Sequence, residues 1–205
     1  MGRLIVGITG ATGIVYGARL LEVLQASLVE THLVVSRAAD MTRAHETCYS
    51  ARDLRDKADV TYTIGDVGAA ISSGSFPTLG MIVAPCSMRT LAEIATGTTT
   101  TLLTRAADVC LKERRRLTLL VRETPLTTIH LRNMLAATEA GAIIFPPVPA
   151  FYDNPRTIDD IVDHTIARVL DLYNIDTGLI RRWGAPPPDA IVGTDAPYVS
   201  ASETL

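Results

Sequence analysis

The chain has 205 residues, of which 47% are hydrophobic and only 5% aromatic, and its formal net charge at pH 7 is −3. This charge gives no general attraction to nucleic acid or to an anionic membrane, and no run approaches the roughly 18 apolar residues of a membrane span. The three cysteines form no CxxC pair, and together with the four histidines they show no metal-ligand spacing. That pattern favours a reducing cytoplasm and no metal site.

We therefore expect a cytoplasmic protein in which residues 1–184 form a single α/β domain. The remaining segment, 185–205, is rich in proline and small polar residues and has no periodicity. It is predicted to be a tail that is disordered unless a neighbouring copy of the chain holds it.

Apolar runs predict five strands that alternate with helical patterns. The strands are expected at 4–8, 31–36, 81–84, 117–121 and 142–145. The helices are expected from the glycine turn to residue 24, and at 37–48, 88–95, 102–113, 127–140 and 158–172. Residues 50–66 are predicted to be loop with one short helix. This alternation predicts a mostly parallel, doubly wound sheet with helices on both faces, which binds ligands beyond the carboxyl ends of its strands.

Glycines surround the end of the first predicted strand, where Gly7, Gly10 and Gly13 are spaced by three residues. Small residues here let backbone N–H groups approach a phosphate or a flavin edge at a helix N-terminus. A tight turn that binds nothing uses the same residues. Ser36-Arg37 stands at the end of the second strand, where an NAD site would have an acidic residue. The sequence therefore favours phosphate contact over NAD.

The third predicted strand ends in a polar segment that runs from Pro85 to Thr90. Ser87 and Thr90 are placed as helix cap and first-turn donor, which suits an anion or a ring edge. Plain helix capping explains the segment nearly as well. Cys86 has no histidine nearby in the sequence, so packing is the expected role of its thiol.

An Arg-Glu pair, Arg122-Glu123, follows the fourth predicted strand and precedes Pro125. Arginine can hold a phosphate with two parallel hydrogen bonds, and a glutamate can transfer a proton if burial raises its pKa. The competing interpretation is structural pairing with Lys112 or Arg105. Function is favoured because the pair is expected at the carboxyl edge of the sheet.

Other polar residues divide between structure and ligand contact. Residues 114–116, three arginines, are expected to form a solvated surface, and His130 a structural part of its helix. Tyr152 follows a proline-rich turn after the fifth strand, which favours ligand contact. Arg168 interrupts the apolar face of the last helix, and its spacing is equally compatible with snorkelling and with contact to a buried anion.

Several segments together resemble the UbiX/Pad family of flavin prenyltransferases. They run in order from about residue 3 to residue 184: GITGATGIVYG, THLVVSRAA, ISSGSF, PCSMRTL, RAADVCLKERRRL, RETPL, PPVPAFY and RRWG. RAADVxLKERR followed by RETPL is highly specific, whereas the opening glycines are not. Within the family the chain is most similar to the members associated with hydroxyarylic acid decarboxylases.

The resemblance implies a flavodoxin-like Rossmann fold, usually assembled as a homododecamer. It implies a metal-independent transferase that joins a dimethylallyl group from dimethylallyl phosphate to N5 and C6 of reduced FMN. The prenylated FMN would then serve a UbiD-type decarboxylase. Two alternatives stay open: a non-catalytic flavin-binding carrier, and a cysteine-decarboxylase-type flavoprotein of the same fold, which should lack the two specific motifs.

The resemblance also implies roles for individual residues. FMN would be held by Gly10, Ala11, Thr12, Ser36, Ser87, Met88, Arg89, Thr90 and Arg122. The donor phosphate would be bound by Tyr152, Arg168, Lys112 and Arg105, the last of these near a contact between copies of the chain. The catalytic residues would be Glu123 for proton transfer, Lys112, the secondary acid Glu46, and Trp183 as a wall of the prenyl pocket.

Two positions depart from the family pattern. Thr12 stands where serine is common and keeps the hydroxyl. Residues 98–101, four threonines, replace a segment that usually has Asn or Asp just before the leucine that precedes RAADV. Because that loop lies close to the contacts between copies in the family, we expect an effect on assembly or donor binding and no loss of activity.

Overall fold

The computed structural model describes residues 2–180, so Trp183 and the predicted tail at 185–205 lie outside the described residues. The described chain contains one six-stranded sheet in the order β3-β2-β1-β4-β5-β6. Every neighbouring pair is parallel. The strands are β1 Gly2–Ile8, β2 Val29–Val35, β3 Val60–Tyr62, β4 Gly80–Cys86, β5 Arg116–Val121 and β6 Ala142–Ile144. The expected parallel, doubly wound sheet is confirmed.

The prediction of loop at 50–66 was wrong for one segment, because β3 lies within it and pairs with β2 from His32 to Val34. Its three residues are too few to give a periodic signal. The strand forms because it pairs with β2, and a local sequence pattern does not show that pairing. Without β3, the other five strands follow the order 2-1-3-4-5 of flavodoxin-like folds. β3 therefore extends a flavodoxin-like sheet at its β2 edge.

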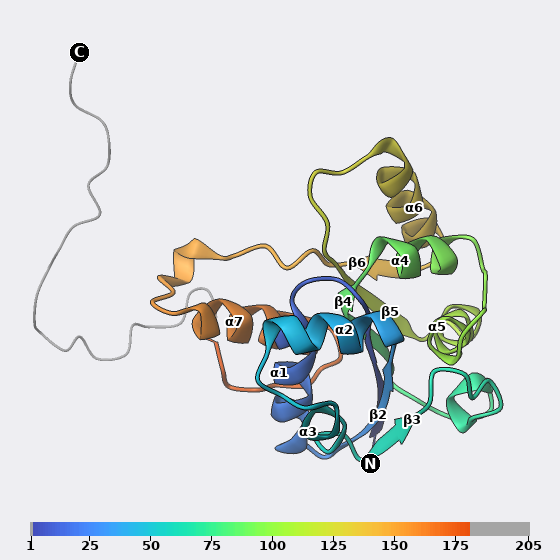
Figure 1. Ribbon diagram of the computed structural model, residues 1–205, viewed down its shortest axis with the longest axis horizontal. Helices are drawn as coiled ribbons and strands as arrows, with labels where there is room; N and C mark the ends of the chain where they lie inside the picture. Colours follow the sequence, from blue (N-terminus) through green and yellow to red (C-terminus); the bar gives the residue numbers. More distant parts are fainter. Residues whose placement is uncertain (1, 181–205) are drawn as a thin grey trace, which may run out of the picture.

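Helices cover both faces of the sheet (Figure 1). One side carries α1 Ile14–Gln25, α2 Arg37–Glu46, α3 Ala51–Arg55 and α7 Ile158–Asp171, and the other carries α4 Met88–Ala95, α5 Leu102–Lys112 and α6 Thr128–Glu139. The predicted helix 37–48 ends two residues early because Thr47 has extended backbone angles. Two short 3-10 helices, η1 Ala70–Ser72 and η2 Phe151–Asp153, lie in connecting loops.

Alternate side chains of the central strands enter two separate cores. Leu4, Val6 and Ile8 of β1 pack on the α1 and α7 side, whereas Ile5 packs with residues of α4 and α5. All four are at most 1% exposed, and fully burying such a side chain stabilises a fold by roughly 1.5–3 kcal/mol. Burial on both faces leaves the ends of the strands as the place for polar chemistry.

The chain crosses the molecule after β6. From Ile144 it runs through η2 to α7, which packs beside α1 on the far side of the sheet (Figure 1). This crossing brings residues 145–157 past the sheet toward α7. Among residues 2–180, no helix is both long enough and apolar enough to cross a lipid bilayer.

Candidate active site

The carboxyl ends of β1 and β4 are joined by Thr9. Its hydroxyl donates to the carbonyl of Pro85 at 2.8 Å and accepts from the backbone N–H of Ser87 at 2.8 Å. β1 is the strand at which the chain order reverses, with β2 on one side and β4 on the other, and open α/β folds bind ligands at such a point. Sequence reasoning missed Thr9 because a single threonine in a glycine turn carries no signal of a link to another strand.

A cavity of about 390 Å³ opens at this edge of the sheet. The capping residues of three helices line it: Ser36 of α2, Ser87 of α4 and Thr101 of α5. The rest of the lining is Gly10, Arg37, Ala38, Ile64, Gly65, Arg89, Thr90, Glu93, Thr100, Leu103 and Thr104. Helix N-termini carry partial positive charge and N–H groups that point outward, so several of them at one cavity favour an anion such as a phosphate.

Hydroxyl groups of α4 and α2 complete their own helix ends. The Ser87 hydroxyl accepts from the backbone N–H of Thr90 at 3.3 Å and donates to the Thr90 hydroxyl at 3.1 Å. The Ser36 hydroxyl accepts from the backbone N–H of Ala39 at 3.1 Å. The helix capping expected of Ser87 is therefore present, and both serines also line the cavity. Contact of these residues with an anion or a ring edge stays a prediction.

The glycine turn between β1 and α1 has little spare room. A Cβ on Gly10 would lie 2.3 Å from the Cβ of Ala38, and Gly13 has a left-handed φ of 98°. The Glu46 carboxylate accepts hydrogen bonds from the backbone N–H groups of Gly13 at 2.9 Å and Ile14 at 3.0 Å. Glu46 thus occupies the N-terminus of α1, whereas the N-termini of α2, α4 and α5 line the cavity.

Arg122 and Glu123 follow β5, and both are exposed in a single copy of the chain. The Glu123 carboxylate accepts from the backbone N–H of Thr124 at 3.0 Å. The expected burial of this carboxyl is therefore absent within one copy. Neither member of the pair forms an ion pair with another residue in 2–180, which removes the structural pairing with Lys112 or Arg105.

The charge of Arg122 also acts on Tyr16, in the first turn of α1. Burial raises the pKa of the Tyr16 phenol, and the Thr165 hydrogen bond and the charge of Arg122 oppose that shift.

Lys112 and Arg105 lie elsewhere in the same copy. Lys112 ends α5 four residues before β5 begins, whereas Arg122 follows the end of β5. A six-residue strand of about 20 Å separates them, and the Lys112 ammonium pairs with Glu113. Arg105 binds Asp108 at 2.7 Å and the carbonyl of Ser72 at 3.3 Å, on the η1 side of α5. One copy of the chain does not bring these two cations to Arg122.

Tyr152 and Arg168 approach from the segment after β6. Tyr152 is 60% exposed on η2, and its hydroxyl lies 3.2 Å from the Nε2 atom of His164 on α7. Arg168 is exposed on α7, where it binds Asp171 at 2.8 Å. Arg168 thus lies on the surface of one copy, and its contact with an anion stays a prediction. Sequence reasoning also missed His164, because nothing in the local pattern connects it with Tyr152.

The threonine-rich loop has a local structural role. Thr101 caps α5, since its hydroxyl accepts from the backbone N–H of Thr104 at 3.3 Å. Glu93 accepts from Arg89 at 2.9 Å and from the Thr100 hydroxyl at 3.3 Å, which holds the loop against α4. Met88 is half-buried against the core on this side of the sheet. The threonines thus supply hydroxyls to the cavity and a cap to α5.

The residues that the sequence assigned to structure are mostly structural. His130 accepts from the backbone N–H of Thr127 through its Nδ1 atom at 3.3 Å and so completes the cap of α6. Cys86 is fully buried, and burial raises the pKa of its thiol far above the ordinary value. A neutral, enclosed thiol is a packing group.

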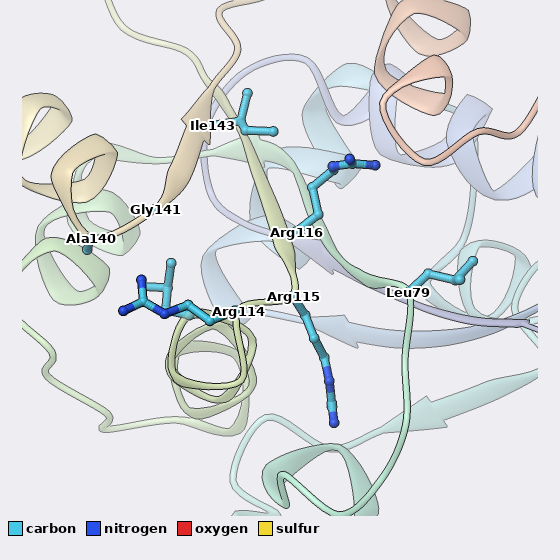
Figure 2. Close-up of a pocket in the computed structure, with 8 residues that line it drawn as sticks. Leu79, Arg114, Arg115, Arg116, Ala140, Gly141 and Ile143 are labelled. Carbon is cyan, nitrogen blue, oxygen red and sulfur yellow. The ribbon is translucent and has the colours of Figure 1, made fainter.

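A second cavity, of about 430 Å³, lies at the amino ends of β4, β5 and β6 and is lined by Arg114, Arg115 and Arg116 (Figure 2). The three side chains point in different directions, so they do not converge on one ligand (Figure 2). Arg115 donates to the carbonyls of Phe76 at 2.7 Å and Gly74 at 2.6 Å. The expectation of a solvated surface is therefore wrong for Arg115, which holds the loop before β4. Within residues 2–180, no group of His, Cys, Asp and Glu side chains is arranged to hold a metal ion.

Comparisons with known proteins agree with this geometry. A family model described as Flavoprotein matches residues 2–170. The flavin prenyltransferase UbiX of Neisseria meningitidis serogroup B is 58% identical over 181 residues, which cover 88% of this chain and 96% of that protein. The flavin prenyltransferase UbiX of Escherichia coli K12 is 55% identical over 186 residues, covering 89% and 98%.

The chain belongs to the UbiX family. Among solved structures, AnUbiX (PadA1) in complex with FMN and dimethylallyl pyrophosphate has a TM-score of 0.88 at 52% identity, covering 90% of this chain and 98% of that chain. A dodecameric FMN-dependent UbiX-like decarboxylase from Escherichia coli O157:H7 has a TM-score of 0.87 at 54% identity, covering 89% and 100%. The peptidyl-cysteine decarboxylase EpiD, at 17% identity and a TM-score of 0.60, shares the fold alone. The predicted family and the flavodoxin-like fold are confirmed.

Proposed function

We propose that this UbiX family member joins a dimethylallyl group from dimethylallyl phosphate to N5 and C6 of reduced FMN. The observation that carries the proposal is the cavity of about 390 Å³ at the β1 and β4 strand ends, where the caps of three helices meet. The crystal structure of a relative with 52% identity and the same fold contains FMN and dimethylallyl pyrophosphate. The flavin is the acceptor of the prenyl group and supplies the two nucleophilic atoms.

The residues present fit FMN. Hydroxyls of Ser36, Ser87 and Thr90 and the helix N-termini behind them suit the phosphate of the flavin nucleotide. Gly10 also lines this cavity, and it packs so closely on Ala38 that only a residue without a Cβ fits at this position. Ala11 and Thr12 continue the same turn, Met88 and Arg89 begin α4, and Arg122 follows β5 beside β4. We assign these five residues to flavin binding as well.

Tyr152 and Arg168 are proposed to bind the phosphate of the prenyl donor. The allylic C–O bond breaks as the new bond to N5 forms, so negative charge grows on the departing phosphate. A guanidinium and a phenol fixed beside that phosphate stabilise this charge without reorganising. Removing one such donor is expected to slow the reaction by roughly 10²-fold or more.

Glu123 is proposed to transfer the proton in the closure of the ring at C6. Its carboxylate is exposed and held by Thr124 in one copy, so a neighbouring copy has to enclose it before it can act in a water-poor site. Lys112 and Arg105 are also proposed to reach the donor phosphate from a neighbouring copy, because α5 places them away from Arg122 in their own copy. Trp183 as a wall of the prenyl pocket, a UbiD-type decarboxylase as recipient of the product, and the cytoplasm as location stay predictions from the sequence.

The decisive experiment is anaerobic incubation of the full chain with reduced FMN and dimethylallyl phosphate, followed by mass spectrometry of the flavin. The expected result is a mass gain of one prenyl unit. Dimethylallyl diphosphate and longer donors are tested in parallel. No mass gain with any donor would falsify the proposal.

Glu123→Gln separates the enzyme from a flavin carrier. In the enzyme the substitution should slow prenyl transfer by about 10²- to 10⁴-fold, the usual contribution of general acid–base catalysis, and leave FMN binding unchanged. The matched control is Glu139→Gln, at the exposed end of α6, which should keep the wild-type rate. A Glu123→Gln protein that still delivers active cofactor to the decarboxylase at the normal rate would identify a carrier.

A further inference from the structure

His164 links the two residues that we assign to the donor phosphate. Its Nε2 atom lies 3.2 Å from the hydroxyl of Tyr152, and the two rings meet edge to face with centroids 5.7 Å apart and planes at 83°. The contact joins η2, in the loop after β6, to α7. It therefore fixes the direction of the Tyr152 hydroxyl relative to the helix that carries Arg168.

The spacing along α7 strengthens this connection. His164 and Arg168 are four residues apart on one helix, which places them one above the other on the same face. Tyr152 reaches that face from outside the helix through its contact with His164. The phenol of Tyr152, the imidazole of His164 and the guanidinium of Arg168 are thus neighbours on a partly exposed surface.

The donor and acceptor capacities of these groups determine how they can work. A phosphate dianion offers only acceptors, so Tyr152 has to use its single O–H as the donor when it binds one. The phenol oxygen then has a lone pair directed toward His164, and only an Nε2–H can satisfy it. Binding of a phosphate therefore selects the form of His164 that carries a proton on Nε2.

We propose that His164 is a positioning residue for the allylic phosphate: its Nε2–H donates to Tyr152 and so directs the phenol proton toward the phosphate. This inference rests on the proposed function, because it assumes that Tyr152 binds the prenyl donor. His164 does not need to touch the donor itself. Its effect is on how well the phosphate is held, so we expect its loss mainly to raise the KM for dimethylallyl phosphate.

Two substitutions separate hydrogen bonding from packing. His164→Phe keeps a flat ring against Tyr152 but removes the N–H, whereas His164→Gln keeps an amide N–H at a similar reach. On the assembled, FMN-bound full chain, His164→Phe should raise the KM for dimethylallyl phosphate roughly three- to tenfold, the range of one hydrogen bond. Because Tyr152 keeps its hydroxyl, the kcat should fall far less than in Tyr152→Phe, and His164→Gln should restore most of the KM.

A double-substitution cycle with Tyr152→Phe provides the decisive readout. Without the phenol hydroxyl, His164→Phe should cause no further rise in KM, and inhibition by inorganic phosphate should weaken in parallel in both single variants. Independent effects in the double variant, or a His164→Gln protein as impaired as His164→Phe, would overturn the assignment. A wild-type protein that transfers no prenyl group would overturn both this inference and the proposed function, whereas an active wild type with unchanged His164 variants overturns this inference alone.

Discussion

Glu46 accepts two backbone hydrogen bonds at the start of α1, from Gly13 and Ile14. A carboxylate at this position is favoured by the positive end of the helix and satisfies N–H groups that have no partner inside the helix. It also orders the turn that leads from β1 to the proposed flavin site. The contacts thus give Glu46 a capping role, and its role as a secondary acid stays a prediction.

Substitutions at Glu46 distinguish these two roles. Glu46→Ala should lower the free energy of unfolding by about 0.5–2 kcal/mol, as the loss of a helix cap does, and weaken FMN binding as the turn loosens. Glu46→Gln keeps an acceptor oxygen, so a cap would retain most of the prenyl-transfer rate. Denaturant unfolding and flavin-fluorescence titration measure both effects. If Glu46→Gln is as inactive as Glu46→Ala while its stability is normal, proton transfer by Glu46 is the better explanation.

His32 is buried at the start of the β2–β3 pairing, with 2% of its surface exposed. Its Nδ1 atom lies 2.9 Å from the Tyr62 hydroxyl, and its Nε2 atom lies 3.2 Å from Glu30, an ion-pair distance without hydrogen-bond alignment. Burial lowers the pKa of the imidazole, and the charge of Glu30 opposes that shift only in part. The folded protein therefore prefers neutral His32.

This preference makes stability depend on pH. The unfolded chain binds a proton at the ordinary pKa of about 6.5, before the folded chain does. The free energy of unfolding should therefore fall as pH drops below about 6.5, until the lower folded pKa is passed. His32→Gln should reduce the difference in stability between pH 7.5 and pH 5.5, measured by denaturant unfolding. His45→Gln, exposed on α2, is the control; an equal pH dependence in wild type and His32→Gln would contradict the assignment.

At the scale of elements, α1 packs close to β4 because residue 17 is glycine. A Cβ at this position would lie 2.4 Å from the carbonyl oxygen of Ala84 and 2.8 Å from Ile8. Ala84 and Ile8 belong to β4 and β1, whose ends form the proposed flavin site. The seating of α1 thus sets the position of the Gly10–Gly13 turn relative to Pro85.

Gly17→Ala tests this packing by the sign of its effect. In an exposed helix, alanine would stabilise by about 1 kcal/mol relative to glycine. Here the added methyl has to displace α1, and overpacking of a core costs typically about 1–3 kcal/mol. We expect a lower free energy of unfolding and weaker FMN binding. Gly68→Ala, whose Cβ would meet nothing closer than 3.7 Å, should be near neutral, and a stabilised Gly17→Ala protein would show that α1 has room to spare.

The long elements could be predicted from the sequence, because each carries its own periodicity. Strands buried on both faces appear as apolar runs, and the alternation with helices follows from the parallel connections. β3 could not be predicted, since its formation depends on pairing with His32, Leu33 and Val34. Contacts between distant segments, such as Thr9 with Pro85, are equally invisible to a local pattern.

Candidate residues followed the same division. Those at strand ends, such as Ser87 and Arg122, could be placed because a parallel sheet gathers its carboxyl ends at one edge. Lys112 was assigned to the donor phosphate by resemblance to the family, and in one copy it sits at the end of a helix that returns to the opposite edge. A resemblance gives a residue its role but does not say which copy supplies it across a strand length of about 20 Å.

At the scale of the whole molecule, one copy leaves large apolar side chains exposed, several of them in two segments, and exposed apolar surface that gathers in patches marks interaction sites. On and before α6 the exposed side chains are Leu126, Ile129, Leu131 and Leu135, and from the loop after β6 to the first residue of α7 they are Val148, Phe151 and Ile158. A relative at 54% identity is dodecameric. Neighbouring copies that cover these surfaces would also enclose Glu123 and Tyr152, so assembly and a complete active site are expected together.

Mixed assemblies test whether one site draws on two copies. Lys112→Ala and Arg168→Ala should each be inactive or strongly slowed alone. If Lys112 acts in a neighbouring copy, co-assembly of the two variants restores sites that have Arg168 from one copy and Lys112 from the other. If the contacts are heterologous and the two variants mix at random in equal amounts, each of the two copies at a site has an even chance of being the required variant. About a quarter of the sites should then be intact. Co-expression with two affinity tags, tandem purification and the mass assay of prenylated flavin measure this recovery.

The matched control pairs Arg168→Ala with Tyr152→Phe. Both positions belong to the same copy, since α7 carries Arg168 and also His164, which contacts Tyr152. No mixed site in that assembly has both residues intact, so activity should stay at the level of the separate variants. Recovery in the first pair alone assigns Lys112 to the neighbouring copy. Equal recovery in both pairs, or none in either with assemblies of normal size, would refute a shared site and confine the reaction to residues of one chain.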